Sequence, residues 1–313
     1  MELEYPKDRY KIIVIDNNSC DGTVAYIHAT YPFVRVLENK ENIGFGRANN
    51  IGIKHTSPEA TYIALLNQDS LVDSHWLFEL VEPMEKNPTA GACGATQKNY
   101  EDYGKKISGE KHLKNCLWMG CGSIIFRKKA LQEIEQQGWF FDPFYFMYVE
   151  DIDITWRLKI AGWDILHTFN ALWFHDGRKR PMSYDNPRLF WSWKNRLYLL
   201  FKFGSWKQIA HSLQNYALLF LITKKNNKEH EQKNSVSSVI EAIEIPLAEK
   251  IEKRGNFSLQ KIYFLVKLSS VFWYTIACAL FQGRKLRKKF LLNQEEIDQF
   301  VQYIDRVFFR LEK

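Results

Sequence analysis

Carboxylates in this sequence follow directly after apolar, β-branched stretches, in positions where they could do chemistry. Asp16 follows IIVI at 12–15, and Asp69 comes shortly after IALL at 63–66. In open α/β sheets, ligands bind at the carboxyl ends of the strands. A carboxylate there can accept a hydrogen bond from a nucleoside, and it can hold Mg²⁺ or Mn²⁺, which prefer oxygen ligands. The alternatives are a plain turn for Asp16 and a helix cap for Asp69, although Ser74 is available for capping.

A second group of acids stands behind an aromatic run, in the stretch FYFMYVEDIDITWR. Glu150 and Asp151 fall at the expected start of a helix, where the helix dipole stabilises negative charge. A carboxylate held ionised there can act as a general base, and the alternative is that both acids only cap the helix. Asp153 and Arg157 are four residues apart on the same helix, which indicates a local ion pair.

Two glycines precede a predicted helix in NIGFGRANN, residues 42–50. They would let the backbone come close to a ligand, and a helix N-terminus favours a phosphate. Asn49 stands where a dinucleotide fingerprint has its third glycine, so the pattern argues against NAD and leaves a plain helix start as the alternative. His175 in LWFHDG is a candidate ligand, although a lone histidine is more often structural. Cys121 has no base in a defined relation to it and is interpreted as packing.

The elements that must position these residues follow from the alternation of short apolar runs with longer amphipathic stretches. The expected strands are 10–15, 33–37, 61–66, 90–96, 118–126 and one or two within 163–174. The expected helices are 23–30, 45–55, 74–86 with Ser74 as its cap, 151–161, and much of the chain from 186 onward. This alternation predicts an α/β fold with a mostly parallel, Rossmann-like sheet. Residues 97–115 are polar and rich in lysine, and we expect them to form a mobile loop.

The composition sets the broad class of the protein. Of the 313 residues, 46% are hydrophobic and 15% aromatic, which is enough for a packed core and excludes global disorder. The five cysteines are scattered without a C-x-x-C pair, which is typical of reduced thiols in the cytosol. No charged and then apolar leader opens the sequence, so we expect no export signal.

The net charge of +7 is concentrated in the last third of the chain. Residues 258–292 contain no Asp or Glu, and 262–281 are long and apolar enough to span a bilayer. A thin polar stripe of Lys267, Ser270 and Tyr274 favours a helix that lies in the membrane interface, with a buried helix and a spanning helix as alternatives. We therefore expect peripheral contact with an anionic membrane. A nucleic-acid binder is disfavoured because the chain has no recognisable binding motif.

Six segments, taken in order, resemble glycosyltransferase family 2, the inverting enzymes of the nucleotide-diphospho-sugar transferase (GT-A) fold. They are IIVIDNNSCDGT, NIGFGRANNIGI, LLNQDS, MGCGSIIFRKKAL, GWFFDPFYFMYVEDIDITWRLKIAGW and FHDG. The nearest likeness is to rhamnosyltransferase-like members that act on surface polysaccharide. The resemblance implies a catalytic domain with a GT-A sheet over residues 1–204 and a basic, helical, membrane-associating region over residues 205–313.

The resemblance also implies roles for single residues. Asp151 looks like the catalytic base, while Asp69 and His175 look like the ligands of Mg²⁺ or Mn²⁺. Asn67 replaces the first acid of the Asp-x-Asp motif. The residues implied at the nucleotide-sugar are Asp16, Asn18, Asn42, Gly46, Asn49, Asn67 and Gln68. Those implied on the acceptor or diphosphate side are Trp118, Glu150, Trp156 and Arg157.

The implied activity is the transfer, with inversion, of a sugar from a nucleotide-diphospho-sugar to a saccharide or lipid-linked acceptor. The donor expected is dTDP-rhamnose or a UDP-hexose. The site of action is expected in the cytoplasm, at the inner face of the cell membrane.

One feature of the family is not matched by this sequence. Family members usually have a strand and a helix before the segment that matches 10–15, and that strand lies between those matching 12–15 and 63–66. The stretch MELEYPKDR cannot supply it, since it has five charges and a proline. We therefore expect an N-terminally shortened domain, in which the flanking strands either pair directly or leave a slot. The alternative to an active enzyme is an impaired relative that binds only a nucleotide or a partner.

Overall fold

The computed structural model describes residues 3–105, 112–175 and 187–203. The chain divides into two units, Met1–Lys179 and Arg180–Lys313, and each is described by itself. The apolar stretch at 262–281, for which a membrane-interface helix is predicted, lies outside the described residues.

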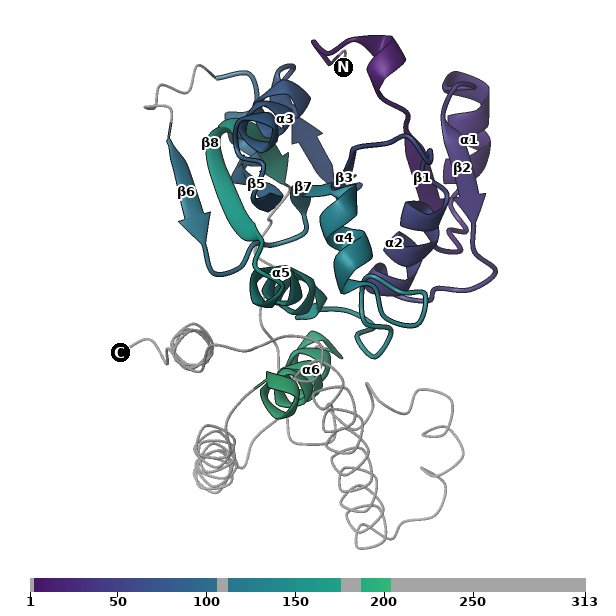
Figure 1. The fold of residues 1–313 in the computed structure, drawn as a ribbon. Helices are drawn as coiled ribbons and strands as arrows, with labels where there is room; N and C mark the ends of the chain where they lie inside the picture. The colour runs from purple at the N-terminus through teal and green to yellow at the C-terminus, as the bar shows by residue number, and fades with distance from the viewer. Residues whose placement is uncertain (1–2, 106–111, 176–186, 204–313) are drawn as a thin grey trace, which may run out of the picture. The chain divides into compact units, whose positions relative to one another are not determined.

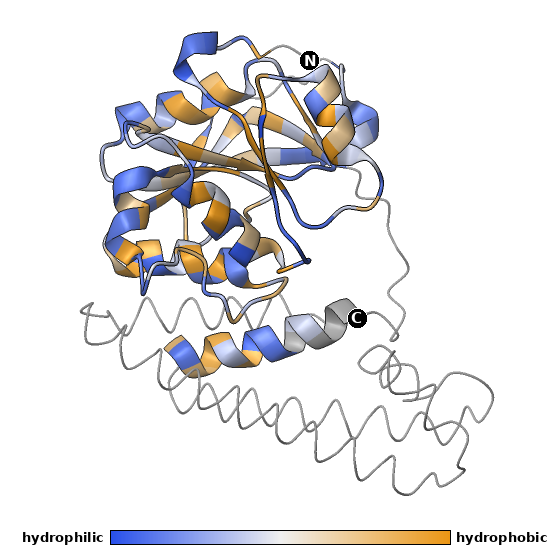
Figure 2. Ribbon diagram, turned by 90° about the vertical axis from the view of Figure 1, so that its right-hand side faces the viewer, coloured by the Kyte–Doolittle hydropathy of each residue, from blue (hydrophilic) through white to orange (hydrophobic). Residues whose placement is uncertain are grey.

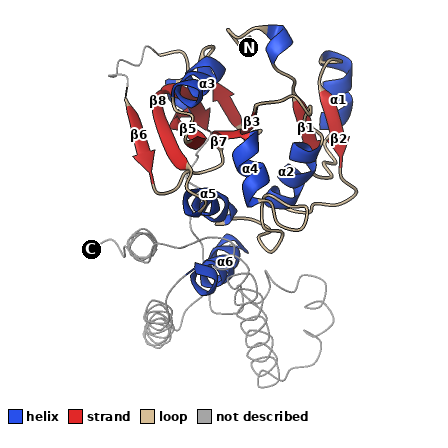
Figure 3. Ribbon diagram, viewed as in Figure 1, coloured by secondary structure: helices blue, strands red, loops and turns tan. Residues whose placement is uncertain are grey.

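The first unit alternates strands with helices, as Figures 1 and 3 show. Its strands are β1 (Ile13–Asp16), β2 (Arg35–Glu38), β3 (Tyr62–Leu66), β4 (Ser70–Val72), β5 (Ala90–Asn99), β6 (Leu113–Cys116), β7 (Ser123–Arg127) and β8 (Asp164–His175). Its helices are α1 (Thr23–Thr30), α2 (Phe45–Lys54), α3 (Trp76–Lys86), α4 (Lys128–Ile134) and α5 (Glu150–Ile160), with 3₁₀ turns η1 (Lys7–Arg9) and η2 (Tyr100–Asp102). The predicted α/β class is confirmed.

The strands lie in two sheets. β1 and β2 form a two-stranded parallel sheet, and the other strands form a sheet with the order β3-β7-β5-β8-β4, in which β6 also pairs with β8. β5 and β8 are parallel, and β7 runs antiparallel between β3 and β5, so β3, β5 and β8 point the same way. β4 and β6 run antiparallel to β8.

β1 and β3 do not pair with each other, so within the described residues each has one edge without a neighbouring strand. Figure 1 shows β1 and β2 set apart from β3 at one side of the unit. Of the two outcomes expected for these flanking strands, direct pairing is not the one observed.

The core of the larger sheet is built by alternation of side chains along its strands. Ile125 joins the cluster beneath α3, together with Trp76 and the fully buried Leu80. Since successive strand residues point to opposite faces, Phe126 lies on the other side, where its ring meets that of Phe141 at 6.5 Å. Figure 2 shows the central strands mostly in orange, between helices that alternate orange and blue.

The prediction of one mobile loop over 97–115 is wrong at both of its ends. β5 continues to Asn99, and β6 is a strand whose residues pair with 165–168 of β8. Residues 106–111 lie outside the described part. β6 is polar and has no apolar alternation, because its backbone pairing to β8 holds it rather than burial of one face. The three-residue β4 was not predicted because it is too short to show an alternation, although its Val72 is buried in the core.

Two predicted element starts also need correction. The strand expected from Trp118 begins at Ser123, and α3 begins at Trp76 with His75 as its N-cap residue. Ser74 therefore does not cap α3. Its hydroxyl donates instead to the Glu4 carboxylate at 2.9 Å, which ties the N-terminal segment to the start of α3.

In the second unit, the described part is the helix α6 (Pro187–Phe203), which confirms the helical prediction for this stretch. The Lys202 side chain is buried and its ammonium lies over the rings of Tyr198 and Phe203, at 5.4 and 5.3 Å. None of the described helices is both long enough and apolar enough to cross a membrane.

Candidate active site

The two residues implied as metal ligands meet at one edge of the larger sheet. Asp69 lies between β3 and β4, and His175 is the last residue of β8, where it pairs with both Ser70 and Asn99. His175 Nε2 lies 3.1 Å from Asp69 Oδ2. The two residues are 106 positions apart in the sequence, so antiparallel pairing of the short strand β4 with β8 brings them together.

The donor atoms of this pair are suitable for a divalent metal ion. One carboxylate and one imidazole are ordinary ligands for Mn²⁺, and both side chains are partly exposed, at 48% for Asp69 and 25% for His175. Exposure leaves room for further ligands such as phosphate oxygens. No third His, Cys, Asp or Glu joins them in a cluster within the described residues.

The acid pair predicted at the start of α5 is present. Glu150 is the first residue of the helix, and Asp151 Oδ1 accepts a hydrogen bond from the Ile152 backbone N–H at 2.8 Å. The two residues before the helix, Tyr148 and Val149, have φ of 68° and 74°, which non-glycine residues rarely adopt. This sharp turn presents both acids at the helix N-terminus.

Burial, rather than hydrogen bonding, dominates the electrostatics of the acid pair. Burial raises the pKa of Asp151 to about 6, against the lowering effect of the Ile152 backbone N–H. Burial and the neighbouring Asp151 charge raise the pKa of Glu150 to about 8. Asp151 is therefore the acid that is ionised at neutral pH, and it keeps part of its surface accessible, while Glu150 is only 8% exposed.

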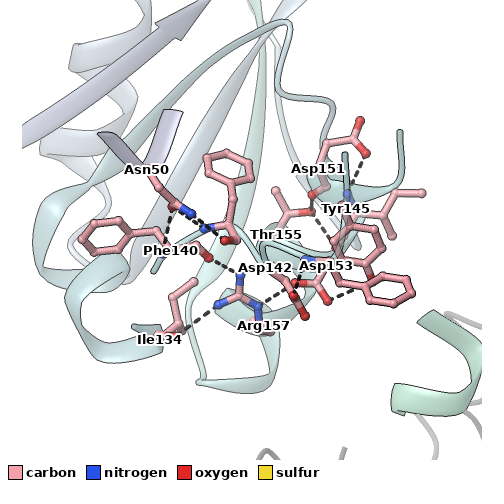
Figure 4. Close-up of polar contacts among 12 residues, drawn as sticks. Asn50, Ile134, Phe140, Asp142, Tyr145, Asp151, Asp153, Thr155 and Arg157 are labelled. Carbon is pink, nitrogen blue, oxygen red and sulfur yellow. Dashed lines mark hydrogen bonds and ion pairs between the residues drawn. The ribbon is translucent and has the colours of Figure 1, made fainter. Parts of the chain in front are cut away.

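Asp153 and Arg157 form the local ion pair that their spacing predicted. Arg157 Nε lies 2.8 Å from Asp153 Oδ2, and both side chains are fully buried. The guanidinium also donates to the backbone carbonyls of Ile134 and Phe140. Figure 4 shows Arg157 enclosed among these partners, with Asp151 projecting away from it.

Trp156 is 1% exposed and Arg157 is 0% exposed, so both side chains are buried in this structure. Arg157 holds the chain around Phe140. The roles implied for these two residues on the acceptor or diphosphate side stay predictions.

The segment Phe140–Phe146, which leads to the acids, is fixed by α2 from the opposite side. Asn50 is 7% exposed, and its side-chain oxygen accepts from the backbone N–H groups of Phe140 and Phe141 at 3.0 and 2.8 Å. Its amide donates to the Phe141 carbonyl at 2.7 Å. Arg47 Nε donates to the Pro143 carbonyl at 2.9 Å. Figure 4 shows Asn50 pointing at this backbone.

The two glycines of the 42–50 motif approach protein rather than open space. Gly44 has φ of +83°, and a Cβ atom there would lie 2.3 Å from the Phe146 carbonyl oxygen. That oxygen accepts from the Phe45 N–H at 3.0 Å, so the first backbone donor of α2 is already used. A Cβ at Gly46 would lie 3.1 Å from the Phe141 Cβ. The close approach that these glycines permit is to the Phe140–Phe146 segment.

The polar residues after β1 form a turn, which is the alternative to a ligand-binding role for Asp16. The buried Asp16 carboxylate accepts from the Ser19 backbone N–H at 3.1 and 3.3 Å. Asn18 is exposed and has φ of 67°, a value that asparagine tolerates better than most residues. No described contact tests the roles of these two residues at a nucleotide.

The other residues implied at the nucleotide-sugar are divided between two places. Asn42 Oδ1 accepts from Asn17 Nδ2 at 2.8 Å and from the Gly44 N–H at 3.0 Å, which links the loop after β1 to the loop before α2. Asn49 Nδ2 donates to the Phe45 carbonyl of its own helix. Asn67 and the exposed Gln68 follow β3 beside Asp69.

The segment 118–122 lies against the acid pair. The Met119 N–H donates weakly to Thr155 Oγ1 on α5 at 3.4 Å, and a Cβ at Gly120 would lie 3.7 Å from Asp151 Oδ2. Trp118, implied on the acceptor side, is partly buried in the same segment. Cys121 is 3% exposed, and burial raises the pKa of its thiol well above the usual range. That environment agrees with its interpretation as packing.

Sequence reasoning gave no role to Asn50 and Gly120. A polar residue on the face of α2 that also carries Gly46 and Ile53 was a signal for Asn50, because buried polar side chains need partners. For Gly120 the sequence held no signal, since its approach to Asp151 depends on how the segment 118–122 meets α5.

The first unit thus combines an acid pair at a helix N-terminus with an aspartate and a histidine that meet at strand ends. Residues 2–156 match the family model described as Glycosyl transferase family 2, so the chain carries a domain of this family.

Curated relatives resemble this chain over about 190 residues. The poly-beta-1,6-N-acetyl-D-glucosamine synthase of Staphylococcus epidermidis is 27% identical over 191 residues, covering 55% of this chain and 43% of the relative. The N-acetylglucosaminyl-diphospho-decaprenol L-rhamnosyltransferase of Mycobacterium tuberculosis is 25% identical over 191 residues, covering 49% and 62%. The chain thus spans about half the length of the curated relatives it matches.

Among solved structures, GalNAc-T7 with UDP, GalNAc and Mn²⁺ is similar with a TM-score of 0.49 and 15% identity, over 64% of this chain and 44% of that chain. The mannosyltransferase PcManGT from Pyrobaculum calidifontis, in complex with GDP-Man and Mn²⁺, has a TM-score of 0.47 and 15% identity, over 92% and 78%.

Proposed function

We propose that this chain transfers a sugar, with inversion, from a nucleotide-diphospho-sugar to a saccharide or lipid-linked acceptor during synthesis of a surface polysaccharide. The observation that carries the proposal is Asp151, a partly exposed residue at the start of α5 whose pKa is raised to about 6 by burial. A general base works best when its pKa lies near the operating pH, and Asp151 meets that condition.

The reaction is one displacement at the anomeric carbon. The acceptor oxygen attacks this carbon while its proton passes to the Asp151 carboxylate. The bond between the anomeric carbon and the diphosphate oxygen breaks, and the electron pair leaves with the nucleoside diphosphate. One displacement inverts the configuration, so the second carboxylate nucleophile of a retaining reaction is not needed.

Asp69 and His175 are the residues that would hold Mg²⁺ or Mn²⁺. Such an ion, when bound, would stabilise the negative charge of the departing diphosphate. The relatives and neighbours named above support a nucleotide-sugar donor, for which dTDP-rhamnose and a UDP-hexose are the candidates. We further propose that the protein acts in the cytoplasm, in peripheral contact with the anionic inner face of the cell membrane.

The experiment that tests the donor class is a thermal-shift screen of UDP-, dTDP- and GDP-sugars, with Mn²⁺ and with EDTA. A ligand that binds the folded state raises the melting temperature. We expect one nucleotide class to raise it only with Mn²⁺, and transfer assays with that donor then follow. No shift with any donor would argue against the proposal.

A second candidate function is an impaired relative that binds a nucleotide or a partner only. The observation that favours it is the separation of β1 and β2 from the larger sheet. Donor binding without hydrolysis or transfer, under conditions in which Asp151 is ionised, would select this alternative.

A further inference from the structure

The Glu150 carboxyl group lies in a position where a charge is expensive. The residue is 8% exposed, and its Oε2 atom has no hydrogen-bond partner among the described residues. A buried carboxylate with an unpartnered oxygen and no neighbouring cation has a large desolvation cost, which protonation removes. The geometry therefore favours a neutral carboxylic acid at this position.

The titratable groups that face Glu150 reinforce this argument. On its own helix, Asp151 and Asp153 both act on it as negative charges, although Asp153 is neutralised by its ion pair with Arg157. On the segment 118–122, the Cys121 thiol is close enough for both acids to raise its pKa. From the Phe140–Phe146 segment, the Tyr145 hydroxyl donates to Asp153 at 3.3 Å. The described groups that act on Glu150 thus add no positive charge next to it.

We propose that Glu150 is a positioning residue that stays protonated during the reaction, so that the acid pair carries one negative charge and Asp151 carries it. This inference rests on the proposed function for its effect on activity. Glu150 does not touch the reacting atoms. It limits the charge beside the base, next to which an anionic donor must also bind.

The proton on Glu150 has a consequence at alkaline pH. The pKa of Asp151 is raised to about 6 and that of Glu150 to about 8, so the pair is singly charged between these values. Above about pH 8 a second buried charge appears beside that of Asp151 and repels the diphosphate of the donor. We expect kcat/KM of the wild type to rise through about pH 6 and to fall above about pH 8, by about tenfold per pH unit.

The test compares the pH profile of Glu150→Gln with that of the wild type. Glutamine is a neutral isostere of the protonated acid, so the variant should keep the rise of kcat/KM through about pH 6 and lose the fall above about pH 8. Glu82→Gln on α3, an acid paired with Lys86 at the surface, is the matched control and should keep both limbs. An unchanged alkaline limb in Glu150→Gln would overturn the proposal.

A second measurement does not depend on activity. Because the folded-state pKa of Glu150 is raised above its unfolded value of 4.5, folding takes up a proton, and the stability of the wild type falls as pH rises through the range 4.5 to about 8. Glu150→Gln lacks this loss, so its melting temperature should rise relative to the wild type across that range. If the difference in melting temperature between Glu150→Gln and the wild type is the same at every pH, the proposal is overturned. If the melting temperatures diverge as expected but no sugar transfer is found, the protonation of Glu150 stands and the proposed function is refuted.

Discussion

The two sides of the candidate site are built in different ways. On the acid side, the Phe140–Phe146 segment is held by Asn50 and Arg157, both buried, through hydrogen bonds to its backbone. On the β1 side, α1 has no buried residue, and Tyr26 and Phe33 are 60% and 74% exposed. Glu150 and Asp151 therefore belong to a part that is fixed before any ligand binds, whereas the β1–α1–β2 part has little of its own to fix it.

This difference in pre-organisation indicates which side of the site the donor would stabilise when it binds. A pre-organised acid side needs no ordering when the donor arrives, which favours catalysis over binding. The β1 side, with few buried contacts and an unpaired strand edge, is the part that a ligand or an added strand would stabilise most. Changes on the acid side should act on rate or global stability, and changes on the β1 side should act on donor affinity.

The largest effect is expected for Asp151→Asn. Loss of a general base lowers the rate by about 10²–10⁴-fold, and the isosteric amide leaves donor affinity nearly intact because the base acts only in the transition state. Steady-state transfer assays and calorimetry with the donor measure the two effects. Residual transfer within about tenfold of the wild type would remove Asp151 from this role.

Breaking the buried pair with Arg157→Met should destabilise the acid side most. The change leaves the Asp153 charge and two backbone carbonyls without their partner, at a cost of about 3–5 kcal/mol in the free energy of unfolding. Urea denaturation measures it. Lys86→Met, which removes the exposed partner of Glu82, is the control and should cost less than about 1 kcal/mol. An equal loss of stability in the two variants would contradict the claim that the buried pair fixes the acid side.

At the proposed metal site, Asp69→Ala should lower Mn²⁺-dependent donor affinity by about 10- to 100-fold. Even the loss of a residue that only supports a metal ligand has an effect of this size. The exposed Asp8 in η1 is a suitable control, and Asp8→Ala should leave donor affinity unchanged. Calorimetry with and without Mn²⁺ measures both variants. Unchanged donor affinity in Asp69→Ala would count against the metal role.

The smallest effect is expected from a strand supplied between β1 and β3. We propose that an N-terminal extension with a strand and helix of the family type pairs with both edges, strengthens donor binding and raises the melting temperature. A gain of about 2 kcal/mol would raise it by about 4–8 °C in a domain of this size. An extension of equal length made of Gly and Ser is the control. Equal melting temperature and equal donor hydrolysis with both extensions would refute this proposal.

The parts of the fold that the sequence predicted are those with a local signal. The apolar run before Asp16, the periodicity of α2 and the acids at the start of α5 lie within a few residues of the elements they indicate. β4 and β6 carry no such signal, because their partners on β8 lie about 50 to 100 residues away. A strand as short as β4, or as polar as β6, is recognised only when the sheet is formed.

The candidate site shows the same limit. Asp69 and His175 were paired through the family resemblance and not through their spacing, because 106 residues separate them. For Arg157 the spacing predicts the local pair with Asp153, which the structure confirms, whereas its role on the ligand side comes from the resemblance and stays a prediction. The buried role of Asn50 depends on backbone groups about 90 residues away, and no pattern in the sequence could name that partner.

Alkylation of Cys121 can measure how often the acid side of the site opens. The thiolate is the form that alkylating reagents attack, and this thiol is buried with its pKa raised well above the usual range. Cys20, on the β1 side, is exposed. The ratio of their alkylation rates, read peptide by peptide in a mass spectrometer, therefore reports how often the segment 118–122 lifts away from α5. That ratio is a gauge of site opening that needs neither substrate nor mutation.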